Sequence, residues 1–214
     1  MTAMKTVYLV RHGESEGNIG LDYQGPNTPL SHKGREQSNV IANRASKLEI
    51  ELLISSPHAR TKETTEKIKA TTSLEPIYSE LFTERRRASD QIGKPKDDPK
   101  VIEIEKTWVE NFHLPYFRYS DEEIFSDLND RAEKALKFII DRPENKIMVV
   151  THGWFMRTLI AKAMFGQELT APICQQFLHN MRTSNTGLTI LEYGKYEDNP
   201  RWQLFVYNDH SHLG

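Results

Sequence analysis

The sequence predicts an α/β fold in which helices cover a mostly parallel central sheet. Three short apolar segments with strand character lie at residues 5–10, 51–55 and 146–151, and each is followed by a segment with helical features. Strands that alternate with helices in this way typically form parallel sheets. Ligands of such sheets bind beyond the carboxyl ends of the strands, so the residues that follow these strands are the first candidates for a functional site.

The composition is that of an ordinary globular domain. The chain has 214 residues, 37% hydrophobic and 27% charged, which predicts a single domain over residues 1–214. A net charge of −2 gives no general attraction to nucleic acid or to a membrane surface, so we expect neither as a partner. Cys174 is the only cysteine, which excludes an internal disulfide and a cysteine-based metal cluster.

Apolar runs are short throughout the sequence. The run before Arg11 is too short for a signal-peptide core, and none approaches the roughly 20 residues of a membrane span. We therefore expect a soluble, cytoplasmic protein.

Turn and capping residues predict the elements of the first half. After the first strand, residues 20–29 contain two Gly-or-Pro turn signals and form a loop. Ser31 is a suitable cap for a helix that runs to about residue 48. After the second strand, Ser56 and Pro57 are typical of an N-cap with proline at the first helical position, and Arg60 follows in the opening turn.

Residues 79–121 differ from the rest of the chain, with a charged run, several Gly and Pro turns and scattered aromatic residues. We interpret them as an inserted lid or specificity region that contains one helix, at about residues 100–111. The sequence Ser120-Asp121-Glu122-Glu123 is typical of a capping box and predicts the start of an amphipathic helix that extends to about residue 140.

The last third of the chain continues the alternation. The strand at 146–151 is followed by a helix over residues 154–165, and two further strands at 186–192 and 202–207 complete the predicted sheet.

The ends of the three main strands carry donors that suit a tetrahedral oxyanion. These are Arg11, His12 and Asn18 after the first strand, Arg60 after the second, and His152 and Gly153 after the third. Guanidinium groups match phosphate oxygens in pairs, and a helix N-terminus attracts anions. No carboxylate pair, Gly-rich P-loop or metal-ligand spacing accompanies them. We therefore expect a phosphoryl site that uses no metal and no cofactor.

A histidine between arginines is a candidate nucleophile. Nearby positive charge lowers the pKa of an imidazole, so the neutral form of His12 is favoured at pH 7. Attack on phosphorus would give a phosphohistidine, with His152 donating to the phosphoryl oxygens. Glu84 is the best candidate for the acid that protonates the leaving oxygen, and Glu80 is a nearby competitor.

Three motifs, in the right order, resemble those of the histidine phosphatase superfamily, also called the phosphoglycerate mutase-like family. They are Arg11-His12-Gly13-Glu14 with Asn18, Ser55-Ser56-Pro57-His58-Ala59-Arg60-Thr61, and Thr151-His152-Gly153. The resemblance also includes Gln24-Gly25, Pro29-Leu30-Ser31 and Gly34, so it spans nearly the whole chain. It implies a three-layer α/β/α sandwich, His12 as the phosphorylated nucleophile and Glu84 as proton donor. It also implies a phosphate pocket of Arg11, Asn18, Arg60 and His152.

Three departures from the family pattern bear on the activity. Gly17 stands where the mutase branch usually has tryptophan, and Glu84 is followed by Arg85-Arg86-Arg87-Ala88-Ser89 rather than by a tyrosine-glycine stretch. Both favour a phosphatase over a sugar-phosphate mutase. Trp154 replaces a second glycine found in many relatives, and it either lines the pocket or packs into the core.

Several assignments stay open at this level. Gln24, Gly25, Arg86 and Arg87 are possible substrate contacts, although residues 85–87 are most simply a solvated basic loop. His58 is either a helix-surface residue or part of the pocket rim.

The activity itself has three interpretations. The first is a phosphatase, acting on a small phosphomonoester or a phosphoprotein. The alternatives are a bisphosphate-dependent phosphoglycerate mutase and a phospho-ligand-binding or scaffold protein without turnover. The sequence decides neither the substrate nor the oligomeric state.

Overall fold

The protein is built on one six-stranded sheet, which we describe from a computed structural model that covers residues 4–114, 116–196 and 199–214. In spatial order the strands are β3 (Ile77–Tyr78), β2 (Leu52–Ser55), β4 (Lys146–Thr151), β1 (Lys5–Arg11), β5 (Leu188–Tyr196) and β6 (Asn199–Asp209). The pairs from β3 to β1 are parallel, whereas β5 and β6 form an antiparallel hairpin that joins the sheet beside β1. The expected mostly parallel sheet is therefore confirmed.

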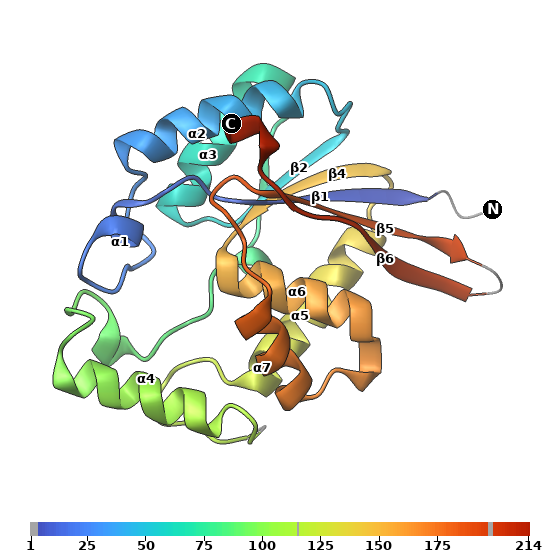
Figure 1. Ribbon diagram of the computed structural model, residues 1–214. Coiled ribbons are helices and arrows are strands. Elements are labelled where there is room, and N and C mark those ends of the chain that lie inside the picture. The colour runs from blue at the N-terminus through green and yellow to red at the C-terminus, as the bar shows by residue number, and fades with distance from the viewer. Residues whose placement is uncertain (1–3, 115, 197–198) are drawn as a thin grey trace.

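Helices cover both faces of the sheet, which gives the expected three layers (Figure 1). On one face lie α2 (His32–Ala45) and α3 (Ala59–Thr72), and on the other α5 (Phe125–Ile140), α6 (Gly153–Phe165) and α7 (Ala171–Asn180). Alternate strand residues face the two sides: Val7 and Leu9 of β1 pack toward α5 and α6, whereas Tyr8 and Val10 pack toward α2 and α3. No helix of the described residues is long and apolar enough to cross a membrane.

Two of the predicted helix starts are wrong, and each has a local cause. The helix after β2 begins at Ala59 with His58 as its N-cap, because the Ser56 hydroxyl bonds to His152 and to the N–H of His58 rather than to an N–H of the first helical turn. The capping box predicted at Ser120 does not form: α5 begins at Phe125, and the carboxylate of Glu122 accepts the backbone N–H groups of residues 119 and 120.

The remaining elements include one predicted helix cap that is confirmed and two elements that the sequence analysis does not predict. Ser31 caps α2 by accepting the N–H of Gly34 at 3.0 Å. The short strand β3 and the helix α7 have no counterpart in the sequence analysis, and β5 and β6 are longer than predicted.

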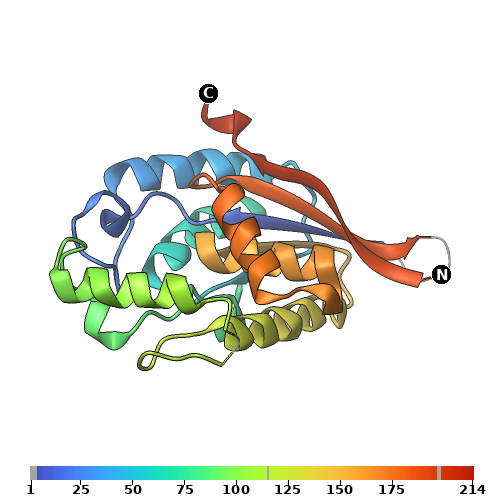
Figure 2. The same cartoon turned by 60° about the horizontal axis from the view of Figure 1, so that its bottom comes forward.

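Residues 79–121, which the sequence analysis interprets as an inserted region, connect β3 to the helix α5. They carry α4 (Pro99–Asn111), which lies apart from the main layers at the same end of the molecule as α1 (Glu16–Ile19) (Figure 2). The two segments touch through bridges between Asp22 and Pro95 and between Tyr23 and Ile92. The loop that follows β1 and the insertion are thereby linked above the ends of the strands.

The loop after β1 packs against the start of α2 with no room for a side chain at Gly34. A Cβ atom on this residue would lie 1.9 Å from the carbonyl oxygen of Glu14, a backbone atom. We expect Gly34→Ala to lower the free energy of unfolding by about 1–3 kcal/mol, as overpacking of a tight contact does. Urea unfolding measures this, with Asn43→Ala on the exposed face of the same helix as the control that changes it by less than about 0.5 kcal/mol. Equal stability of the two variants would contradict the packing described here.

Candidate active site

The parallel strands deliver two histidines to one place. Arg11 at the end of β1 is in register with Thr151 at the end of β4, and the N–H of His12 donates to the carbonyl of Thr151 at 3.0 Å. The residues that follow, His12 and His152, therefore lie side by side with ring centroids 5.2 Å apart. Both rings are almost fully buried.

The tautomer of His12 is fixed by the backbone carbonyl of the next residue. Its Nδ1 lies 2.6 Å from the carbonyl oxygen of Gly13, an acceptor only, so Nδ1 carries the proton. The Nε2 atom is then the lone-pair nitrogen, and it accepts from Nε of Arg60 at 3.3 Å. Burial and the charges of Arg60 and Arg11 hold the pKa of His12 well below its usual value. The imidazole is thus neutral and presents a nucleophilic atom beside a guanidinium group.

The other two histidines extend this cluster. His152 bonds through Nε2 to the Ser56 hydroxyl at 2.8 Å, while its Nδ1 is buried without a partner among the described residues. His58 stacks edge-on against His152 at 4.9 Å, and burial and Arg60 lower its pKa to about 4. Burial, then Arg60, also lowers the pKa of His152 well below its usual value.

Arginine side chains surround the histidines from two elements. Arg60 is 2% exposed and donates from Nη1 to the carbonyl of Gly25 at 3.0 Å. Arg11 donates from Nη1 to Thr183 O at 2.6 Å, and its buried Nε has no partner within the described residues. A Cβ on Gly153 would lie 3.2 Å from that Nε, so glycine allows the guanidinium to approach the start of α6.

Glu84 lies against the N-terminus of α6. Its carboxylate accepts from the backbone N–H groups of Phe155 at 3.0 Å, Trp154 at 3.3 Å and Arg85 at 2.9 Å. Burial raises the pKa of this carboxyl, but the three N–H bonds and the charge of Arg60 outweigh it, so the pKa lies below its usual value. Without a bound anion, Glu84 is ionised.

The arginine and glutamate side chains described above line one cavity of about 870 Å³. Among the predicted site residues, the lining contains Arg11, Asn18, Gln24, Gly25, Arg60, Glu84, Arg86, Arg87 and Gly153, and also the competitor Glu80. The rings of His12 and His152 are buried beside the Arg60 and Gly153 that line it. The structure therefore brings all of the predicted site residues to one end of the sheet.

The solvated-loop interpretation is wrong for Arg85. This residue is 4% exposed, with its guanidinium 3.8 Å from the ring centroid of Trp108 and ion-paired to Glu105 at 3.3 Å. Arg87 pairs with the same carboxylate at 2.5 Å, and only Arg86 is exposed. Trp154 lines the cavity and packs edge-on against Trp108.

Sequence reasoning missed several lining residues, among them the charged side chains of Lys96, Glu123, Arg131, Arg157 and Arg182. Arg131 and Arg157 occupy helices whose charged positions look like ordinary solvated faces, so no local signal marks them. The described residues contain no group of three or more His, Cys, Asp or Glu side chains placed to hold a metal ion.

Comparison with known proteins gives a consistent family. The family model described as histidine phosphatase superfamily (branch 1) matches residues 7–209. A curated relative, "Probable phosphoglycerate mutase GpmB" of Escherichia coli O1:K1, is 30% identical over 162 residues, which cover 74% of each chain.

Solved structures share the fold over nearly the whole chain. Bacillus stearothermophilus YhfR is 28% identical with a TM-score of 0.80, covering 98% of this chain and 100% of its own. A putative alpha-ribazole-5'-P phosphatase from Escherichia coli has 19% identity, a TM-score of 0.79 and 96% coverage of both chains. A mycobacterial glucosyl-3-phosphoglycerate phosphatase has 22% identity and a TM-score of 0.77, covering 95% of this chain and 99% of that one.

The neutral histidines of the site make stability depend on pH. Because their pKa values are lower in the folded chain than the ordinary value of about 6.5, the unfolded chain binds more protons below that pH. The free energy of unfolding should therefore fall between pH 6.5 and 5, by at most about 1.4 kcal/mol per pH unit and per ring.

Urea unfolding at pH 7, 6 and 5 measures this loss. His58→Leu should reduce it by about one ring's contribution, while His212, whose pKa is also lowered, contributes equally to both proteins. Identical pH dependence of wild type and His58→Leu would show that His58 is not held neutral by the fold.

Proposed function

The chain belongs to the histidine phosphatase superfamily, and we propose that it is a metal-independent phosphatase that hydrolyses phosphomonoesters through a phosphohistidine. The observation that carries this proposal is the tautomer of His12, which leaves Nε2 as a lone-pair nitrogen within 3.3 Å of Arg60. A phosphoryl group held by that guanidinium lies within reach of the nucleophile.

In the first step, Nε2 of His12 attacks phosphorus and the bond to the leaving oxygen breaks. Arg11 and Arg60 balance the charge of the phosphoryl oxygens, together with Asn18 and the N–H of Gly153 at the start of α6. The Nδ1 of His152, buried without a partner among the described residues, would complete this set as a donor, because its Nε2 already meets Ser56.

Glu84 supplies the proton that the leaving oxygen needs. A phosphoryl dianion close to the carboxyl raises its pKa, so the group gains a proton when the substrate binds. In the second step, water attacks the phosphohistidine while Glu84 accepts its proton, which releases inorganic phosphate and frees His12. General acid–base assistance of this kind contributes about 10²- to 10⁴-fold in rate.

A mutase is the second candidate, favoured by the 30% identity to a probable phosphoglycerate mutase. Against it stands Gly17, where a Cβ atom would lie 2.4 Å from the Cβ of Gln24, so the tryptophan of the mutase branch has no room. Against a binding protein without turnover stands the complete set of His12, Arg11, Arg60, His152 and an acid, Glu84, around one cavity.

Phosphate release tests the reaction. We expect turnover of phosphomonoesters in the presence of EDTA, loss of at least about 10³-fold in His12→Ala, and little change in His32→Ala, an exposed histidine of α2. Quenching the reaction of an ester labelled at phosphorus with alkaline detergent, which preserves the acid-labile phosphohistidine, should trap label on the wild-type chain only. Transfer that requires an added bisphosphate would favour the mutase, and phosphate binding without turnover would favour the binding protein.

The cavity carries more positive charge than one phosphoryl group neutralises. Its lining has nine basic and three acidic side chains. Arg85 and Arg87 are paired with Glu105, and Arg131 with Glu123. Arg182 is exposed and forms no ion pair within the described residues. We infer that the substrate has a second anionic group on its leaving side.

The phosphate esters of propanol and of 3-hydroxypropanoate differ in that charge and test this preference. The carboxylate ester should have the higher kcat/KM, and Arg182→Gln should lower that value about 3- to 10-fold, since exposed charge pairs contribute about 0.2–1 kcal/mol and partly desolvated ones more. The propyl ester should be unaffected by the substitution. Equal kcat/KM for the two esters would contradict a second anionic subsite.

A further inference from the structure

The proton donor lies on a segment whose backbone is held by an ion pair that the reaction does not use. Residues 83–86 form no helix or strand. We propose that Glu123 and Arg131 are positioning residues, which fix this segment and thereby aim the carboxyl of Glu84 at the leaving oxygen. This inference rests on the proposed role of Glu84 as proton donor.

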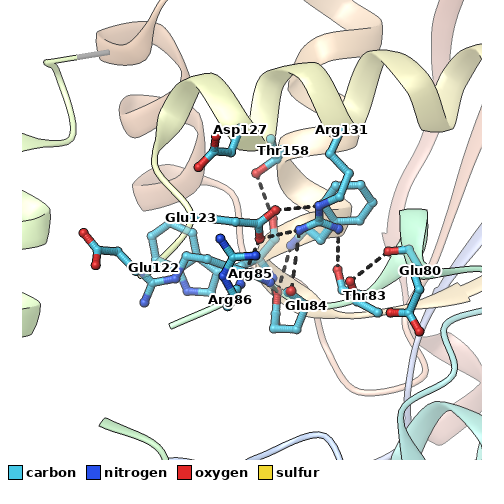
Figure 3. A network of polar contacts seen from close by, with 12 residues as sticks. Glu80, Thr83, Glu84, Arg85, Arg86, Glu122, Glu123, Asp127, Arg131 and Thr158 are labelled. Carbon is cyan, nitrogen blue, oxygen red and sulfur yellow. Dashed lines mark hydrogen bonds and ion pairs between the residues drawn. The ribbon is translucent and has the colours of Figure 1, made fainter. Parts of the chain in front are cut away.

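Arg131 projects from α5 and holds the segment by its carbonyl groups (Figure 3). Its Nη1 donates to the carbonyl of Thr83 at 2.8 Å and to that of Leu81 at 3.2 Å, and Nη2 lies 3.5 Å from the carbonyl of Glu84 itself. The guanidinium plane covers the ring of Phe155 at 3.9 Å. One side chain thus contacts three backbone carbonyl groups, those of Leu81, Thr83 and Glu84.

Glu123 holds the segment from the other end. Its Oε2 accepts from the backbone N–H of Arg86 at 2.8 Å, and its own N–H donates to the carbonyl of Arg86 at 2.9 Å. The carbonyl of Glu123 accepts from the indole N–H of Trp108 at 3.0 Å. The backbone is therefore held one residue before Glu84, at Thr83, and two residues after it, at Arg86.

The two positioning residues are joined to each other in a fork. Nε and Nη2 of Arg131 donate to the two carboxylate oxygens of Glu123, each at 2.7 Å (Figure 3). Glu123 is 7% exposed and the Arg131 side chain 14%, so each charge depends on the other for compensation. A bidentate pair between a guanidinium and a carboxylate is planar and has one preferred geometry. It can therefore hold the backbone groups bound to it in one orientation.

The carboxyl of Glu84 and its backbone are consequently held by different elements. The N-terminus of α6 binds the carboxylate, whereas Arg131 of α5 and Glu123, two residues before α5, bind the main chain around it. Loosening the backbone leaves the nucleophile and the phosphate-binding groups in place, because none of them contacts this ion pair. The expected defect is confined to proton donation.

The dependence on the leaving group measures proton donation separately. An alkyl phosphate needs a proton on its leaving oxygen, whereas 4-nitrophenyl phosphate loses 4-nitrophenolate, a stable anion that needs no proton to leave. We compare kcat/KM for 4-nitrophenyl and propyl phosphate, because their ratio cancels any difference in the amount of folded enzyme. Glu84→Gln should lower the propyl value about 10²- to 10⁴-fold and the nitrophenyl value far less.

Glu123→Gln and Arg131→Lys should shift the ratio in the same direction. We expect the propyl value to fall about 10- to 100-fold, the cost of a misplaced catalytic group, with less than about 3-fold change for the nitrophenyl ester. In the Glu84→Gln background, Glu123→Gln should shift the ratio no further, because the group it positions is gone.

Glu122→Gln is the matched control. Glu122 is equally buried and also binds two backbone N–H groups, but these belong to residues 119 and 120, outside the segment of Glu84. The ratio of kcat/KM for the two esters in Glu122→Gln should equal that of wild type.

Three outcomes would overturn the proposal: an equal fall for both esters, an unchanged ratio in Glu123→Gln and Arg131→Lys, or a further shift in the Glu84→Gln background. An unchanged ratio in Glu84→Gln itself would instead refute the proton donor of the proposed function.

Discussion

The site depends on a contact between a charged guanidinium and a neutral imidazole. Arg60 donates from Nε to Nε2 of His12, and this bond exists only while the imidazole is unprotonated. Both side chains are almost completely buried, so a second positive charge on the ring would meet little solvent screening. The fold therefore has to keep a positive charge and a neutral imidazole together in a place from which water is largely excluded, and it does so with the backbone carbonyls of Gly13 and Gly25 as acceptors.

The position of Arg60 comes from hydroxyl groups beneath the site. The Thr64 hydroxyl accepts the N–H of Gly13 at 3.1 Å and donates to the carbonyl of Arg60 at 2.9 Å. The hydroxyl of Ser38 lies 3.2 Å from the oxygen of the Thr64 hydroxyl. These residues belong to α2, α3 and the loop after β1, so one buried network ties both helices to the segment that carries His12. Because buried hydroxyls are costly when unpaired, the network favours a single relative placement of the three elements.

The strand ends could be predicted from the sequence because apolar strands and the charged residues that follow them are local patterns. Arg11, His12, Arg60 and His152 lie where that pattern places them. Arg85 could not be assigned in this way, because its burial depends on Trp108 and Trp154, which lie far from it in sequence. The start of α5 was misplaced for a related reason: Glu122 and Glu123 bind backbone groups of the insertion instead of capping the helix.

In the proposed reaction one carboxyl must act first as an acid and then as a base, and the surroundings of Glu84 explain how the two roles follow each other. The N-terminus of α6 and Arg60 favour its ionised form. A phosphoryl dianion is attracted by the same guanidinium, so its arrival cancels part of that field and raises the carboxyl pKa. When the proton has left with the alcohol, the positive field again favours the carboxylate, which is the form that accepts a proton from water. The state of the acid is thus set by the charge of the group in the pocket, and this requires that Glu84 stay at a fixed distance from Arg60 through both steps.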